Sequence, residues 1–189
     1  LLYDFPDLGD VDKMMEYLDN GRAADQPRAE LLLGKLYYEG KWVPADSKKA
    51  EEHLKKAAGT EIAAHYYLGQ IYRRGYLGQV YPQKAVDELL IAARGGQNSA
   101  DYAIAQLYSQ GKGTIPNPVN AWVFSQLALK QGTPQATDLA QQLSAALPPE
   151  KLAAAQRLLE QEQKVRGASS QNALAMQALQ KEDGEDAPL

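Results

Sequence analysis

The stretch AELLLGKLYYEG at residues 29–40 decides the fold, because two variants of it follow at nearly fixed distances. AHYYLGQIYRRG occupies residues 64–75 and ADYAIAQLYSQG occupies residues 100–111, so successive copies lie 35 and 36 residues apart. Six features keep this register through all three copies, including a tyrosine, a small residue in mid-helix and a glycine at the end. Self-similarity at such a period indicates a repeat architecture in which each unit stacks on its neighbours.

Each copy begins with the pattern of an amphipathic helix. In copy one, Ala29, Leu33 and Leu36 recur at the three-and-four spacing of a buried helical stripe. A glycine follows in every copy, at the place where a left-handed residue ends a helix: Gly40, Gly75 and Gly111. We therefore expect the first helix of each repeat to end at these glycines.

A second helix is predicted a few residues after each of these glycines. Asp46 and Asn117 are side chains that cap a helix start, and Pro82 and Pro118 suit a first helical position. Within the first helices, the repeated small residue (Gly34, Gly69, Ala105) predicts close helix–helix approach, because glycine in mid-helix otherwise costs about 1 kcal/mol relative to alanine.

These patterns predict an all-α solenoid of stacked helix-turn-helix repeats. After copy three, a fourth first helix is expected at residues 136–147 and a last helix from Glu150 to about Val165. The predicted organisation is a remnant of an upstream repeat (1–21), a repeat unit with its C-terminal cap helices (22–165) that contains three repeats (29–63, 64–99 and 100–135), and a polar, acidic tail (166–189).

The pattern A-x3-LG-x2-Y-x2-G, followed by a capped helix that ends in two alanines before a glycine, resembles the Sel1-like subclass of tetratricopeptide repeats. The resemblance covers about residues 22–165, and LSAALPPEKLAAAQRLLEQ at residues 143–161 is similar to the cap that closes such arrays. It implies a right-handed α-solenoid with a C-terminal capping helix that serves as an interaction scaffold.

Within this family, HYYLGQIYRRGYLGQVYPQKAVDELLIAARGG at residues 65–96 resembles the outer-membrane lipoproteins of bacterial alginate secretion. This likeness implies a periplasmic scaffold that links an alginate-modifying enzyme to the outer-membrane porin, with a lipid anchor on an N-terminal segment outside this chain. Two alternatives stay open. One is a Sel1-type adaptor in signalling that binds a protein or peptide in its groove, and the other is direct binding of the alginate polymer.

Composition and motifs argue against catalysis and against nucleic-acid binding. The net charge of −4 gives no broad basic surface, and the chain has no cysteine for thiolate chemistry or metal ligation. The two histidines, His53 and His65, are expected to pack within their helices, and Asp101 and Glu88 are expected to be isolated carboxylates. No catalytic residue, cofactor site or metal site is predicted.

Partner binding is predicted on the concave face, which first helices line in two-helix repeats. Tyrosine and arginine are favoured interface anchors because each combines a large flat surface with a polar end. The positions offset from the packing stripe are predicted to face the groove: Leu31, Lys35, Tyr38, Tyr66, Gln70, Arg73, Tyr102, Gln106 and Ser109. The alternative is a solvated face whose tyrosines cover the edges of the core.

The acidic tail has two interpretations. Its polar composition is typical of a disordered end. Its apolar triplet, Leu174, Met176 and Leu179, instead indicates a short segment that docks on a partner and orders on binding.

Overall fold

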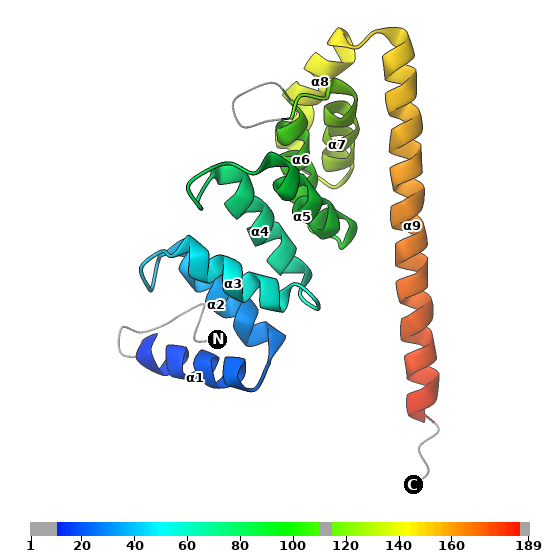
Figure 1. Cartoon of the computed structure of the whole chain (residues 1–189). Coiled ribbons are helices and arrows are strands. Elements are labelled where there is room, and N and C mark those ends of the chain that lie inside the picture. Colours follow the sequence, from blue (N-terminus) through cyan, green and yellow to red (C-terminus); the bar gives the residue numbers. More distant parts are fainter. Residues whose placement is uncertain (1–10, 110–114, 186–189) are drawn as a thin grey trace.

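The computed structural model of this chain describes residues 11–109 and 115–185, and beyond residue 171 it describes the backbone alone. Every regular element in this part is a helix, so the predicted all-α class is confirmed for it (Figure 1). The elements are α1 (Val11–Ala23), α2 (Pro27–Glu39), α3 (Ser47–Ala57), α4 (Ile62–Arg74), α5 (Pro82–Arg94), α6 (Ala100–Tyr108), α7 (Pro118–Lys130), the 3-10 helix η1 (Pro134–Ala136), α8 (Thr137–Ala146) and α9 (Pro149–Glu185).

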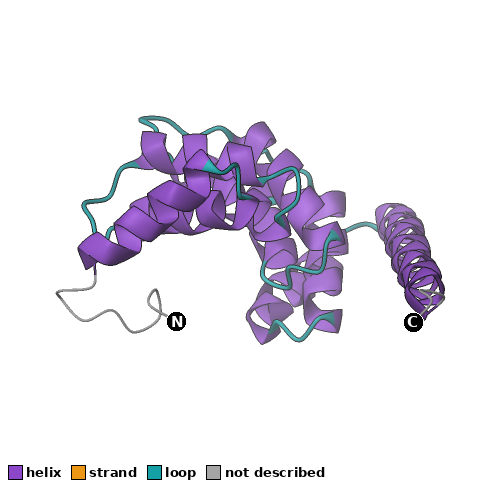
Figure 2. Ribbon diagram, turned by 90° about the horizontal axis from the view of Figure 1, so that it is seen from below, coloured by secondary structure: helices purple, strands orange, loops and turns teal. Residues whose placement is uncertain are grey.

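The helices form a stack of antiparallel pairs. The pairs α2–α3, α4–α5 and α6–α7 follow one another in chain order, each packed on the next, with α1 at one end and α8 at the other (Figure 1). The helix α9 then turns back and runs along the stack toward the level of α1. Viewed along its axis, α9 stands to one side of the repeats (Figure 2). No helix among the described residues is long and apolar enough to cross a membrane.

Glycines in the middle of first helices allow the two helices of a repeat to approach closely, as predicted. A Cβ at Gly34 would lie 2.6 Å from Cγ of Leu54 on α3, and one at Gly69 would lie 2.5 Å from Cγ of Leu89 on α5. In the third repeat, alanine replaces the glycine at position 105, and the residue in register with the two leucines is the smaller Ser125. The larger side chain on one helix is thus matched by a smaller one on its partner.

The predicted helix ends and starts agree with the observed ones. Gly40 and Gly75 end α2 and α4 with φ angles of 64° and 72°, which are left-handed. The side chain of Asp46 accepts a hydrogen bond from the backbone N–H of Lys49 at the start of α3. Pro82 and Pro118 are the first residues of α5 and α7. The third predicted glycine stop, Gly111, lies outside the described residues.

The predicted end of the last helix was wrong. The sequence predicted a cap helix that ends near Val165 and then a tail, whereas α9 continues to Glu185. Between Pro149 and Glu185 the chain has no further proline, and Gly167 costs about 1 kcal/mol without ending a helix. Ser169 and Ser170 donate hydrogen bonds to the carbonyls four residues before them, which keeps both hydroxyls satisfied within the helix.

Candidate functional site

Two repeats contain the same partly buried acid–imidazole pair with its members exchanged. In the first repeat, Glu30 on α2 contacts Nδ1 of His53 on α3 at 2.6 Å. In the second, His65 on α4 contacts Glu88 on α5, also at 2.6 Å. Positions 30 and 65 are in register, as are 53 and 88, so the carboxylate and the imidazole have changed places. The prediction that Glu88 is isolated was wrong, because the exchange was not recognised in the sequence.

In the third repeat the acid of this pair remains and the imidazole is lost. Asp101 occupies the position of Glu30 and His65, but the residue in register with His53 is Phe124, whose ring stacks on Tyr108 at 6.0 Å. Asp101 is fully buried, and it accepts two hydrogen bonds from Arg166 on α9, at 2.8 and 2.9 Å. The prediction that Asp101 is isolated was therefore wrong.

A second arginine on the stack extends this contact. Arg94, at the end of α5, donates two hydrogen bonds of 2.9 Å to the carboxylate of Glu162 on α9. Glu162 also accepts from Nε of Arg166 at 3.2 Å. The hydrogen bond from Arg94 lowers the pKa of Glu162 against the opposing effect of burial. Burial alone would lower the pKa of Arg166, but its bonds to Asp101 and Glu162 raise it. Four charged side chains thus join α9 to the repeats.

The contacts of the two histidines and their carboxylate partners give these side chains structural roles. His53 and His65 are each joined to one carboxylate, and His65 also contacts the carbonyl oxygen of Ala58 at 2.9 Å. The described residues contain no group of three side chains that could hold a metal ion. The ring of His53 also stacks on Tyr37 at 5.8 Å, in agreement with its predicted packing role.

The predicted binding residues come from three neighbouring first helices. On α4, Tyr66, Gln70 and Arg73 are spaced four and three residues apart and therefore share one face of the helix. The same positions on α2 are Leu31, Lys35 and Tyr38, and those on α6 are Tyr102, Gln106 and Ser109. We call their partly exposed members, with three neighbours identified below, the first-helix surface: Lys35, Tyr38, Tyr66, Tyr67, Arg73, Arg74, Tyr76, Tyr102, Gln106 and Ser109.

Two predicted members are not accessible on this surface. Leu31 is 1% exposed and belongs to the core between the first two repeats, since an apolar side chain there packs against the next repeat. Gln70 is 5% exposed, so its predicted exposure was also wrong. The Nε2 of Gln70 donates to the hydroxyl of Tyr66 at 2.8 Å, which places the glutamine beneath the tyrosine. The buried Oε1 of Gln70 has no hydrogen-bond partner among the described residues.

The side chain of Arg73 reaches from α4 to α6. It is partly buried and donates a hydrogen bond to the side-chain oxygen of Gln106. Burial lowers the pKa of Arg73, and the charge of Arg74 lowers it further, while the nearby hydroxyls of Tyr66, Tyr102 and Tyr38 act in the opposite direction. Within the described part of the chain, Arg73 makes no ion pair with a carboxylate.

Aromatic rings continue this surface from α4 to α2. The ring of Tyr38 lies edge-on to that of Tyr67 at 5.2 Å and tilted against that of Tyr76 at 6.0 Å. The ammonium of Lys35 lies 5.8 Å from the centre of the Tyr67 ring. Arg74 donates to the hydroxyl of Tyr76 at 3.4 Å. Sequence reasoning missed Tyr67 and Tyr76, although their position beside predicted members and in the bulky loop at residues 76–80 was a usable signal.

The predicted docking triplet lies outside the described side chains. The backbone of Leu174, Met176 and Leu179 belongs to α9, but the structure does not describe the side chains of these residues. Their assignment as a docking segment therefore stays a prediction.

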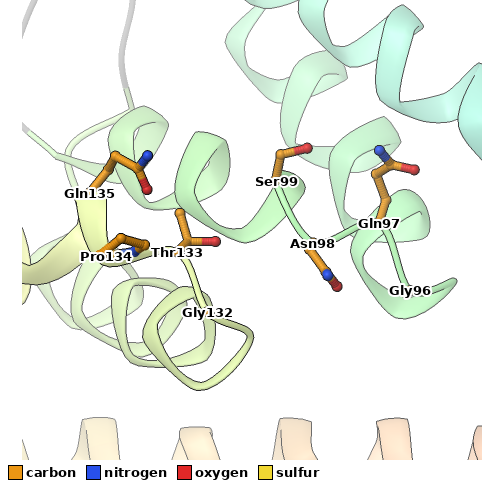
Figure 3. A pocket seen from close by; sticks show the side chains of 8 residues that line it. All are labelled: Gly96, Gln97, Asn98, Ser99, Gly132, Thr133, Pro134 and Gln135. Atoms are coloured by element: carbon orange, nitrogen blue, oxygen red, sulfur yellow. The ribbon is translucent and has the colours of Figure 1, made fainter.

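A polar pocket that the sequence did not predict lies between two equivalent turns. Residues 96–99, between α5 and α6, and residues 132–135, after α7, line a space of about 510 Å³ (Figure 3). Gly96 and Gly132 are in register and have positive φ angles of 96° and 84°. The lining is polar but carries no charged or titratable side chain, so it offers hydrogen bonds and no acid–base chemistry.

Comparison with known proteins gives this geometry a context. The Sel1 repeat family model matches residues 27–58, 62–96 and 98–133. The chain is 81% identical, over 99% of its length, to the alginate biosynthesis protein AlgK of Pseudomonas syringae pv. tomato. It is 56% identical over 95% of its length to AlgK of Azotobacter vinelandii, and 61% identical over 97% to AlgK of Pseudomonas aeruginosa. The chain spans 38–40% of the length of these relatives.

Two solved structures share the architecture. One is c5321, a protective antigen of uropathogenic Escherichia coli with an SLR fold, at a TM-score of 0.64 and 20% identity. That match covers 85% of this chain and 34% of the antigen. The other is a Sel1 repeat protein from Oxalobacter formigenes, at a TM-score of 0.57 and 28% identity, covering 74% of this chain and 42% of that protein. The predicted solenoid fold is confirmed by these similarities.

Proposed function

Because this chain belongs to the Sel1 repeat family, we propose that it is a non-catalytic protein-binding segment of a scaffold that serves alginate modification and export. The observation that carries the proposal is the first-helix surface, where tyrosines from three consecutive repeats and two arginines of α4 gather on one side of the stack. The link to alginate comes from relatives named alginate biosynthesis protein that are 56–81% identical to nearly the whole chain.

The composition of the surface favours a protein partner. Tyrosine and arginine are enriched among residues that dominate protein–protein affinity, because they bury a large area and keep a polar end to orient the contact. The ring of Tyr38 contacts the rings of Tyr67 and Tyr76, which limits the side-chain entropy that binding would cost. A partner that covers this surface therefore meets groups that are already ordered.

The proposal extends to the place of this segment in the cell. We assign it to the periplasm, in a longer protein held at the outer membrane by an N-terminal lipid. There it would join an alginate-modifying enzyme to the porin that exports the polymer. The C-terminal residues Leu174, Met176 and Leu179 are proposed as a second contact for the same partner, and the division into residues 1–21, 22–165 and 166–189 is proposed as its domain organisation.

The experiment is a pull-down from the periplasmic extract of an alginate-producing bacterium, with this chain as bait and mass spectrometry as readout. We expect the alginate-modifying enzyme in the wild-type eluate and its loss with Tyr66→Ala/Arg73→Ala. The matched control is Lys56→Ala/Gln83→Ala, which removes exposed side chains from two second helices. Recovery of signalling proteins without any alginate protein, or no enzyme at all, would contradict the proposal.

A second bait tests the C-terminal contact separately. A chain that ends at Ser170 lacks the apolar triplet but keeps Arg166 and its bonds to Asp101. We expect this bait to retain less enzyme than the full chain. Equal recovery would remove the triplet from the binding site and leave the first-helix surface as the proposed contact.

A further inference from the structure

We infer that Arg73, together with the hydroxyl of Tyr66, forms a binding site for one side-chain carboxylate of an acidic peptide segment in the partner protein. This inference rests on the proposed scaffold function and specifies the chemistry of its ligand. It follows from three features of the first-helix surface: a partly buried cation with no carboxylate partner among the described residues, a directed hydroxyl donor, and a buried acceptor that no described residue pairs.

The first feature is the environment of Arg73. The partly buried arginine of α9, Arg166, has the carboxylates of Asp101 and Glu162 as partners. Arg73 is also partly buried, yet its described hydrogen-bond partner is the neutral amide oxygen of Gln106. A guanidinium taken partly out of water is costly unless a charge compensates it. A carboxylate is the group that a guanidinium binds best, because it can accept two parallel N–H bonds.

The second feature is the orientation of the Tyr66 hydroxyl. Gln70 donates its Nε2–H to this hydroxyl oxygen at 2.8 Å, so the hydroxyl acts as an acceptor toward the interior. Its own proton then remains to be donated, and no described residue accepts it. Tyr66 and Arg73 lie on one face of α4, seven residues apart, so both can donate to a ligand held over that face. The hydroxyl of Tyr102 lies near the same guanidinium.

The third feature is Gln70 itself. Its side chain is 95% removed from solvent, and its Oε1 has no partner among the described residues. Leaving such an acceptor unpaired destabilises the fold, and unpaired buried groups of this kind call for an explanation such as a functional role. A carboxylate has no proton to donate to this oxygen, so the donor that pairs with it on binding is an N–H of the peptide segment that carries the acid.

The distribution of charge favours an acidic peptide over the alginate polymer. A polyuronate carries one carboxylate on each sugar and would be matched by cations repeated along the surface. The positions in register with Arg73 are Tyr38 and Ser109, and neither is charged. One acid set among apolar and hydrogen-bonding contacts fits this arrangement, as in the recognition of acidic motifs by arginine. The chain as a whole has a net charge of −4, so attraction for an acid is local to this surface.

The test is peptide phage display with random 12-residue peptides on the wild-type chain, followed by affinity measurements on four forms. These are wild type, Arg73→Met, Gln70→Met and Arg157→Met, the last an exposed arginine of α9 that serves as control. We expect enrichment of peptides with Asp or Glu, a loss of about tenfold or more for Arg73→Met, and unchanged affinity for Arg157→Met. Thermal melts show whether each variant folds.

Gln70→Met separates binding from packing. If the buried Gln70 amide contributes to binding by orienting the Tyr66 hydroxyl toward the ligand, this variant loses peptide affinity while its melting temperature stays near that of wild type. A fall in melting temperature at unchanged affinity would assign Gln70 a purely structural role and overturn its part in the site. Peptides without acid enrichment, or equal affinity for wild type and Arg73→Met, would overturn the carboxylate site.

The second part of the test measures the binding of mannuronate oligomers. If they bind wild type in an Arg73-dependent manner while no acidic peptide is selected, the ligand is the polymer and the inference is wrong. The pull-down distinguishes failure of the carboxylate site from failure of the proposed scaffold function. Recovery of the alginate-modifying enzyme by Arg73→Met at the wild-type level would refute the site and leave the scaffold function standing, whereas no recovery by wild type would refute the scaffold function.

Discussion

Arg166 on α9 holds the fully buried carboxylate of Asp101 on α6 with two hydrogen bonds, at 2.8 and 2.9 Å. The other two repeats satisfy the same position internally, with a carboxylate–imidazole pair between their two helices. The third repeat has Phe124 where the histidine stands in the first, so its acid requires a cation from outside the repeat. This requirement specifies where α9 docks on the stack.

Removal of Arg166 is therefore expected to release α9. Arg166→Ala leaves a buried acid without a partner, a change that costs about 3–5 kcal/mol where the site stays closed. Undocking of α9 relieves part of this cost, so we expect backbone amides of residues 150–166 to lose protection in hydrogen exchange.

A double variant and a surface control complete this test. Asp101→Ala/Arg166→Ala leaves no buried charge, and we expect it to be more stable than Arg166→Ala alone. Arg157→Ala removes an exposed arginine of the same helix and should leave exchange unchanged. Equal protection in Arg166→Ala and wild type would show that the ion pair does not hold α9.

Docking of α9 is also expected to weaken in acid. The bond from Arg94 lowers the pKa of Glu162 below its ordinary value of 4.5, so the ionised form stabilises the folded state. This contribution is complete above about pH 4.5 and is lost as the pH falls through the lowered value in the folded state. Thermal melts from pH 7 to pH 3 should show this loss, and Glu162→Gln should have a smaller pH dependence over the acidic part of the range. The same pH profile in Glu162→Gln and in the exposed control Glu160→Gln would contradict this assignment.

Exchange of the acid and the imidazole should be tolerated in the first repeat. The double variant Glu30→His/His53→Glu reproduces the order that the second repeat has in His65 and Glu88. We expect its stability to lie within about 1 kcal/mol of wild type, whereas His53→Glu alone places two carboxylates together and should cost about 1–3 kcal/mol. Urea denaturation at pH 7 measures the difference. A double variant no better than His53→Glu would show that the two repeats are not equivalent.

The close approach of first and second helices depends on Gly69. A Cβ there would meet Cγ of the buried Leu89 at 2.5 Å, so Gly69→Ala should destabilise by about 1–3 kcal/mol through overpacking, and Gly69→Leu by more. Gly59 has no atom within 4 Å of a Cβ placed on it, so Gly59→Ala is the matched control. Lys35→Ala should also be nearly neutral for folding. Similar melting temperatures for all these variants would contradict the assigned packing.

The fold was predictable because its signals are local and repeated. The glycines at positions 34 and 69, the caps at Asp46 and Asn117 and the stops at Gly40 and Gly75 each act over a few residues, and repetition made chance agreement improbable. The contacts of α9 were not predictable in this way. Arg166 lies 65 residues from Asp101, and nothing near either residue indicates the other.

The candidate site was predicted in part for a similar reason. Helical spacing correctly brought Tyr66 and Arg73 to one face, but it could not show that the next repeat covers Leu31 or that Gln70 lies beneath Tyr66. Burial at these positions depends on how closely the neighbouring repeat packs on the helix. The spacing of residues along one helix does not determine that distance.

The central claim, that the first-helix surface binds a protein partner, is tested most directly by calorimetric titration of this chain with the purified alginate-modifying enzyme. The account predicts saturable binding by wild type, a loss of affinity of about tenfold or more for Tyr66→Ala/Arg73→Ala, and wild-type affinity for Lys56→Ala/Gln83→Ala. The same affinity for all three folded forms, or no binding by wild type, would contradict it.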